Sequence, residues 1–135
     1  MNADEDRAWR FLLAWARHLD CTVCPKVRLE DFIEAWGPER QRLRMEIKSR
    51  HVDFLLVNRA WQPVLAVEVD GGVHLRPDRR REDERKNAVL AAAGIDLLRL
   101  PADGAWEHIF DARERRGSQV PARPPHSANG ALGPR

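Results

Sequence analysis

The sequence predicts a single domain of the α/β class, and three observations support this fold. Two hydrophobic runs, Val52–Val57 and Val64–Val69, are each interrupted by one acidic residue. Because consecutive positions in them are apolar, both faces of the sheet that they form should be covered by helices. An amphipathic segment, Arg7–Leu19, precedes these runs, and a helical segment, Arg80–Ala93, links them to a third run, Ile95–Leu100. Helices and strands that alternate in this way are typical of α/β proteins.

The elements before the two hydrophobic runs are shorter. Arg7–Leu19 carries apolar residues three and four positions apart, and the acids before it suit the positive end of a helix dipole. Lys26–Leu29 indicates a short strand, and Glu30–Trp36 indicates a short helix that a Gly-Pro pair ends. Residues 39–51 are rich in charge and fit no single element.

The second half of the chain gives clearer signals. Asn58–Pro63 should form the turn between the two hydrophobic strands. Acids near the start of Arg80–Ala93 and Gly94 after its end indicate a helix. Ile95–Leu100 is expected to be a further buried strand, and Ala105–Arg113 a last short helix. The expected order is helix, strand, short helix, two or three strands, helix, strand, helix.

The length of 135 residues suits one domain with a core that needs no disulfide or metal. We place this domain at residues 1–115. Residues 116–135 hold four prolines and three glycines among polar residues, and we expect a disordered tail there. The net charge is +2, but three arginines of the tail supply +3, so residues 1–115 are not basic overall. Contact with nucleic acid would therefore need a local basic patch or the tail.

The sequence favours a cytoplasmic protein without a membrane partner. No apolar run approaches the ~20 residues that cross a bilayer. The first residues include three acids, whereas a secretory signal begins basic and then turns apolar.

Cys21 and Cys24 form a C-x-x-C motif, for which three interpretations stay open. A zinc site usually needs four ligands, and no second pair with metal-ligand spacing completes the set. A redox pair usually sits between a strand and a helix, and no such unit is expected before Cys21. These points favour two ordinary small residues near the start of a strand.

Asp53 and Glu68 are carboxylates inside hydrophobic strands. An unpaired charge in such surroundings is costly, so each acid needs a cationic partner or a metal ion. Strand side chains alternate, so Glu68 and Asp70 should share a face, and Asp53 can join them if the strands pair as a hairpin. Three converging carboxylates suit Mg²⁺ or Mn²⁺ with open water positions. Ion pairs with neighbouring arginines are the alternative, and the residues alone leave both open.

A resemblance to a known family adds to these observations. Four parts of the sequence carry it: Val52–Val57, Ala66–His74, the pair Asp83 and Lys86, and Ala93–Leu100. Together they resemble bacterial nuclease-related domains of unknown function that are distant relatives of the very-short-patch-repair endonucleases. These domains are members of the PD-(D/E)XK superfamily. Motif, spacing and element order all agree over most of the expected domain.

The resemblance implies a restriction-endonuclease-like core, in which a small mixed sheet is flanked by helices. It also implies a metal-dependent nuclease that hydrolyses phosphodiester bonds of nucleic acid, with DNA as the expected partner and Mg²⁺ (or Mn²⁺) as the cofactor. An alternative is a catalytically inactive module of the same fold that binds nucleic acid or a protein. A third possibility is an interaction domain that acts through its tail and its tryptophan-bearing helices.

The resemblance also implies roles for individual residues. Asp53 and Glu68 correspond to the acids that bind the metal, and Asp70 stands where the superfamily usually has a lysine. Asp70 would complete the metal shell or act as a base. Lys86 shares one stripe of its helix with Asp83 and Leu90, so it can reach the acids at the strand ends and would supply the missing positive charge to catalysis. Glu5 would touch the metal through water.

A basic cluster surrounds this motif. Its residues are Arg76, Arg79, Arg80, Arg81, Arg85 and Lys86. We expect Arg80 and Arg81, together with His74 and Arg99, to contact nucleic acid, because arginines beside a metal site can hold phosphates. A solvated helix face is the alternative, since acids are interleaved with these arginines. Arg99 lies within a hydrophobic strand and should find a buried partner, with an active-site carboxylate as the candidate.

Overall fold

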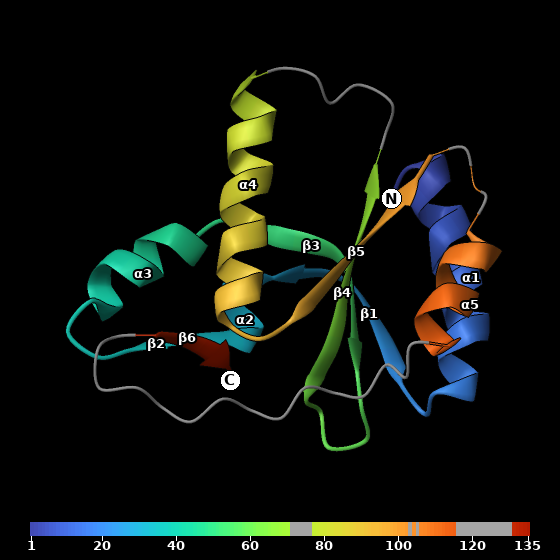
Figure 1. Ribbon diagram of the computed structural model, residues 1–135, viewed down its shortest axis with the longest axis horizontal. Helices are drawn as coiled ribbons and strands as arrows, with labels where there is room; N and C mark the ends of the chain where they lie inside the picture. Colours follow the sequence, from blue (N-terminus) through green and yellow to red (C-terminus); the bar gives the residue numbers. More distant parts are fainter. Residues whose placement is uncertain (71–76, 103, 105, 116–130) are drawn as a thin grey trace.

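The structure is a computed structural model that describes residues 1–70, 77–102, 104, 106–115 and 131–135 (Figure 1). The elements follow one another in this order: α1 (Ala3–His18), β1 (Thr22–Arg28), α2 (Leu29–Phe32), β2 (Ile33–Trp36), α3 (Arg40–Ile47), β3 (His51–Val57), β4 (Pro63–Asp70), α4 (Pro77–Ala92), β5 (Asp96–Pro101), α5 (Glu107–Arg115) and β6 (Ala131–Pro134).

The central sheet has four strands in the order β1-β3-β4-β5. Strands β1, β3 and β4 are antiparallel neighbours, whereas β4 and β5 run parallel. A parallel pair needs a crossover, and α4 lies in the connection between β4 and β5. Strands β2 and β6 form a separate antiparallel pair. The predicted α/β class with a small mixed sheet and flanking helices is confirmed.

Both faces of the central sheet are covered, as the unbroken hydrophobic runs predict. On one face, Leu12 and Trp15 of α1 and Phe110 of α5 pack with Phe54 and Leu65 of the sheet. Figure 1 shows α1 and α5 side by side on that face, with α2, α3 and α4 on the other.

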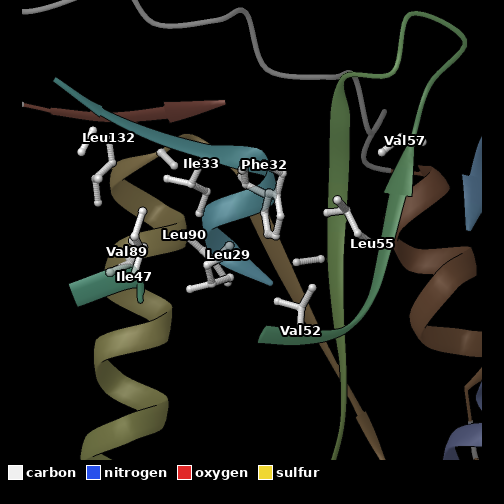
Figure 2. Packing of buried hydrophobic residues seen from close by; sticks show 14 residues of the cluster. Leu29, Phe32, Ile33, Ile47, Val52, Leu55, Val57, Val89, Leu90 and Leu132 are labelled. Atoms are coloured by element: carbon white, nitrogen blue, oxygen red, sulfur yellow. The ribbon is translucent and has the colours of Figure 1, made fainter. Parts of the chain in front are cut away.

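The second core lies on the face opposite α1 and α5. Figure 2 shows it from close by, with Leu29 of α2, Ile47 of α3 and Leu90 of α4 against Val52 and Leu55 of β3. The sheet therefore joins two hydrophobic cores, each with its own set of helices. None of the helices in the described part of the chain has both the length and the apolar character to cross a membrane.

The expected short helix over Glu30–Trp36 is wrong in its second half. The helix α2 ends at Phe32, and Ile33–Trp36 forms strand β2. Its partner is β6, almost a hundred residues later in the sequence, with Ile33 opposite Pro134. Such a distant partner overrides local propensity. The ambiguous stretch 39–51 contains α3 and the first residue of β3.

The structure also differs from the expectation of a disordered tail. Residues 116–130 lie outside the described residues, but Ala131–Pro134 forms β6. Leu132 is buried in the second core, and the N–H of Arg135 donates to the carbonyl of Phe32 at 2.8 Å. A strand of only four residues, rich in Gly and Pro, has no recognisable sequence pattern and is stabilised by its tertiary partners.

Candidate functional site

Five charged side chains form a row that crosses the central sheet from α1 to α4. In order along it they are Glu5, Lys26, Asp53, Glu68 and Lys86, from α1, β1, β3, β4 and α4 respectively. We call this set the charged row. Acids and lysines neutralise one another along it, and its centre is the pair of acids Asp53 and Glu68.

Asp53 and Glu68 meet because of the register of their strands. Phe54 lies opposite Val67, so the next residues outward are Asp53 and Glu68. Their side chains share a hydrogen bond, and the Asp53 carboxylate also accepts one from the backbone N–H of Val69 at 2.8 Å. Both acids are buried, with 9% and 7% of their surface exposed. The hydrophobic strands thus hold two carboxyl groups side by side and away from bulk water.

The surroundings push the pKa values of these two acids apart. Burial and the hydrogen bond with Asp53 raise the pKa of Glu68 to about 7, against the attraction of Lys86. Burial also opposes ionisation of Asp53, but the hydrogen bonds from Glu68 and Val69 and the charges of Lys26 and Lys86 lower its pKa. Asp53 is therefore the charged member, and Glu68 holds a proton up to near-neutral pH.

Lys86 lies against Glu68, as its spacing on the helix predicts. Its ammonium group contacts the Glu68 carboxyl group directly, and its side chain is only 17% exposed. The expected proximity of Lys86 to the strand acids is confirmed. A partly buried lysine that touches one carboxyl of an acid pair is well placed to stabilise negative charge there.

Glu5 joins the row through Lys26 and not through a carboxylate neighbour. Its backbone N–H donates to Asn2 Oδ1 at 2.8 Å, and its own carboxylate accepts from the N–H of Asn2 at 3.3 Å. This capping box fixes the first turn of α1 and places Glu5 where it is 8% exposed. Lys26 Nζ then lies 2.8 Å from Glu5 Oε1 and 3.5 Å from Asp53 Oδ1.

Lys26 is the residue of the row that the sequence did not reveal. In the sequence it is one residue of the expected short strand Lys26–Leu29, and its two partners come from other elements. Burial disfavours its charge, but the hydrogen bond from Lys26 to Glu5 and the charges of Asp53 and Glu5 outweigh it and raise the pKa of Lys26. The ammonium group is therefore firmly charged.

The backbone of Lys26 is unusual. Its φ is 51°, in the left-handed region, although it lies inside strand β1. Pro25 and Val27 both pair with β3, whereas Lys26 between them does not. A non-glycine residue held in such a conformation costs about 1–3 kcal/mol and is kept where its surroundings require it.

Asp70 does not join the two central acids. Its carboxylate lies 3.4 Å from Arg99, whose guanidinium also reaches Asp83 at 3.7 Å and Asn87 at 2.8 Å. Glu68 and Arg99 are opposite each other in the parallel pair β4–β5, so Arg99 fills the space beside Asp70. Arg99 thus has a carboxylate partner, as the sequence predicts, but this partner is not buried: the side chain of Asp70 is 37% exposed.

The expected cluster of three carboxylates is consequently not formed. Among the residues that the structure describes, no group of three or more acidic, histidine or cysteine side chains could hold a metal ion. Two carboxylates, Asp53 and Glu68, are adjacent, and Mg²⁺ is commonly bound by one or two carboxylates together with waters and substrate phosphates. The acid pair fits such a cation, with Glu5 nearby.

Three of the four residues that we expect to contact nucleic acid lie in the described part of the chain. Arg80 and Arg81 are exposed on the first half of α4, on the same helix as Lys86. Arg99 is half-buried and engaged with Asp70 and Asp83. His74 lies outside the described residues.

Cys21 and Cys24 are both free and half-buried. Cys24 packs against the core that contains Leu55, whereas Cys21 packs against the core that contains Leu56. Burial raises the pKa of both thiols, with a smaller effect of Asp20 on Cys21. A raised pKa lowers the thiolate fraction, so the interpretation as ordinary packed residues is favoured.

A surface cavity of about 440 Å³ lies apart from the charged row, between β2 and α3. Its lining includes Glu34, Arg44 and Lys48 but no residue of the row. Lysine and acid side chains there serve below as controls for changes in the row.

The chain matches a protein-family model that covers this site. A family model described as "Protein of unknown function (DUF2726)" matches residues 1–109. The chain belongs to this family. The match contains all five residues of the charged row, so the row lies within the DUF2726 domain. Neither the curated proteins nor the solved structures contain a match to this chain.

Proposed function

We propose that this DUF2726 domain is a metal-dependent nuclease of the PD-(D/E)XK superfamily that hydrolyses phosphodiester bonds of DNA. One observation carries the proposal: the buried pair Asp53 and Glu68 lies beside the ammonium group of Lys86. These are the three residues to which the sequence resemblance gives the metal-binding and charge-stabilising roles. They come from β3, β4 and α4, and the fold brings them together.

The fold is compatible with a restriction-endonuclease-like core. The mixed four-stranded sheet has helices on both faces, and the two acids lie on the central antiparallel strands β3 and β4. Helix α1 precedes the sheet and contributes Glu5, in agreement with the place that the resemblance gives to this acid. This likeness of arrangement supports the superfamily assignment and is part of the proposal.

The energetics of the acid pair favour a cation site over a structural role. Two carboxyl groups placed side by side in a hydrophobic sheet are costly, because the charge of one disfavours ionisation of the other. A purely structural position is more simply filled by an apolar residue. Perturbed acids of this kind cluster at functional sites.

Each residue has a distinct task in the proposed site. Asp53 and Glu68 would hold Mg²⁺ or Mn²⁺, which when bound supplies a Lewis acid that polarises the phosphate and lowers the pKa of a water molecule. The Val69 N–H orients the Asp53 carboxylate. The Lys86 ammonium stabilises negative charge that develops on the phosphate.

Asp70 and the arginines take supporting roles in this proposal. Asp70 fixes Arg99 beside the site, which differs from the metal or base role expected from the sequence. The exposed Arg80 and Arg81 contact the phosphate backbone of DNA and set its position without reading its sequence.

The proposal is tested with end-labelled double-stranded DNA, single-stranded DNA and RNA, each incubated with EDTA, Mg²⁺, Mn²⁺ or Ca²⁺. We expect cleavage of DNA with Mg²⁺ or Mn²⁺ and none with EDTA. Glu68→Gln should abolish cleavage, whereas Glu34→Gln, which makes the same change at an exposed acid of β2, should not. Absence of cleavage on every substrate and metal would contradict the proposal.

The second candidate is an inactive module of the same fold that binds nucleic acid. Asp70 stands where the superfamily usually has the catalytic lysine, and this acid is paired with Arg99. The acid in place of the lysine favours this candidate. This candidate predicts DNA binding that needs no metal and that Glu68→Gln leaves unchanged. Arg80→Ala together with Arg81→Ala should weaken such binding and make it less dependent on salt.

A further inference from the structure

Lys26 places a positive charge between two acids that come from different elements. Its Nζ lies 2.8 Å from Glu5 Oε1 of α1 and 3.5 Å from Asp53 Oδ1 of β3. Asp53 is also the charged member of the central acid pair. A single ammonium group therefore occupies the space between one of the two acids that fit a metal ion and the acid of α1.

The backbone conformation of Lys26 supports a functional role for this placement. Lys26 has a φ of 51° and is missing from the pairing between β1 and β3, although Pro25 and Val27 on either side are paired. It sits between them at the level of Asp53, which lies between their partners Phe54 and Val52. Strain of this kind persists only where the surrounding structure requires it, and it is frequent at functional sites.

We propose that Lys26 is a positioning residue that acts as an internal cation: in the metal-free protein its ammonium group holds Glu5 and Asp53, and a divalent cation displaces it from Asp53. This inference rests on the proposed function, because it concerns the same acid pair. It adds Lys26 as a competitor of the metal ion for Asp53, and the assignment of metal ligands alone does not include such a competitor.

Lys26 fits this role better than Lys86 does. The side chain of Lys26 is 46% exposed, so its ammonium can move into solvent when a cation arrives. Lys86 is 17% exposed, and its one ion pair within the described residues is with Glu68. Lys26 can also remain attached to Glu5 after it leaves Asp53, whereas in the described part of the chain Lys86 forms no ion pair with a second carboxylate.

The experiment measures Mn²⁺ affinity by titration calorimetry at fixed pH and ionic strength. The variants are Lys26→Met, which keeps the length of the side chain, and Lys26→Gln, which keeps an N–H donor. Lys48→Met is the matched control, because Lys48 is an exposed lysine that lines the cavity beside α3. Circular dichroism and melting curves verify that each variant is folded.

We expect both Lys26 variants to bind Mn²⁺ at least about fivefold more tightly than the unchanged protein, within the usual range of coupling between two ligands. Lys48→Met should change the affinity less than about twofold, since exposed charges at longer distance are screened. A tighter site is the opposite of what damage to the fold produces, so the direction separates the proposed role from a structural one.

The outcomes also separate this inference from the proposed function. Equal or weaker Mn²⁺ binding by both folded Lys26 variants, with binding by the unchanged protein, overturns the inference and leaves the metal site intact. No binding by any of the proteins at millimolar Mn²⁺ overturns the metal site itself. Binding by the Lys26 variants alone supports the inference, because the competitor has then been removed.

A second measurement follows Lys26 directly. Reductive methylation with ¹³C-labelled methyl groups keeps the positive charge of each lysine and gives it an NMR signal, and the signal missing from Lys26→Gln identifies Lys26. Titration with Mg²⁺ should shift the Lys26 signal along the binding curve and leave the Lys48 signal in place. A Lys26 signal that stays unchanged through saturation with Mg²⁺ contradicts displacement.

Discussion

Asp53 and Glu68 lie side by side on neighbouring antiparallel strands, and a hydrogen bond joins their buried carboxyl groups. Burial and the hydrogen bond with Asp53 raise the pKa of Glu68 to about 7, whereas the pKa of Asp53 is lowered. A divalent cation would compete with that proton, so stability, metal binding and activity should all depend on this pair.

The first prediction concerns the pH dependence of stability. The pKa of Glu68 rises from 4.5 to about 7 on folding. The contribution of this group to the unfolding free energy is therefore fully present below pH 4.5 and is lost as the pH rises through 7. Glu68→Gln cannot lose a proton. Relative to this variant, the metal-free protein should lose on the order of 2–3 kcal/mol of unfolding free energy between pH 4.5 and 8.

Urea denaturation at several pH values in EDTA measures this difference. Glu34→Gln is the control, since it changes an exposed acid of β2 and should follow the unchanged protein. A constant difference between the protein and Glu68→Gln across this pH range would show that Glu68 titrates normally.

The second prediction concerns stabilisation by metal. A cation that binds only the folded protein stabilises it by about 2.7 kcal/mol at a concentration one hundred times its Kd. Scanning calorimetry should therefore show a melting temperature several degrees higher in millimolar Mn²⁺. Asp53→Asn and Glu68→Gln should each remove this rise, and Asp96→Asn, at an exposed acid of β5, should keep it. A melting curve that does not respond to Mn²⁺ would favour the inactive binding module.

The third prediction concerns Lys86. Its ammonium group pairs with Glu68, and its loss should remove charge stabilisation at the reacting phosphate. Lys86→Ala should reduce the rate of DNA cleavage by about 100-fold or more. Its effect on the melting temperature should be small at pH 6, since Glu68 then carries a proton. Arg85→Ala, at the neighbouring exposed position of α4, is the control for general loss of charge. Near-normal cleavage by Lys86→Ala would exclude this lysine from the reaction.

The fourth prediction concerns β6. Leu132 is 4% exposed and packs in the same core as Ile33 and Leu90. Leu132→Ala should lower the unfolding free energy by about 2–4 kcal/mol, as large-to-small changes in a core do. Leu13→Ala, at a leucine that is 37% exposed on α1, should cost much less. Equal stability of Leu132→Ala and the unchanged protein would show that β6 does not hold the domain together in solution.

Sequence patterns predicted the central part of the molecule well, for physical reasons that are visible in its strands. The hydrophobic runs around Asp53 and Glu68 form β3 and β4, because long buried strands have a strong local signal. The spacing of Lys86 on its helix also predicted its contact with the acids. These features depend on the pattern within one element or on two adjacent ones.

The features that sequence patterns missed depend on distant partners. Strand β2 was expected to be helical and forms because β6 lies beside it. Asp70 was expected to join the other two acids, but it pairs with Arg99 of β5 and, within the described residues, forms no three-acid group with them. Lys26 had no signal at all, since its role depends on a left-handed backbone and on carboxylates from α1 and β3.

The charged row is assembled from both sides of the turn that joins β3 to β4. Glu5, Lys26 and Asp53 come before this turn, and Glu68 and Lys86 come after it. A chain divided between Asn58 and Gln62 would give two fragments, each with an incomplete site. If the two halves reassociate through the pairing of β3 with β4, the proposed nuclease activity would appear only when both fragments are mixed, and it would then report their assembly.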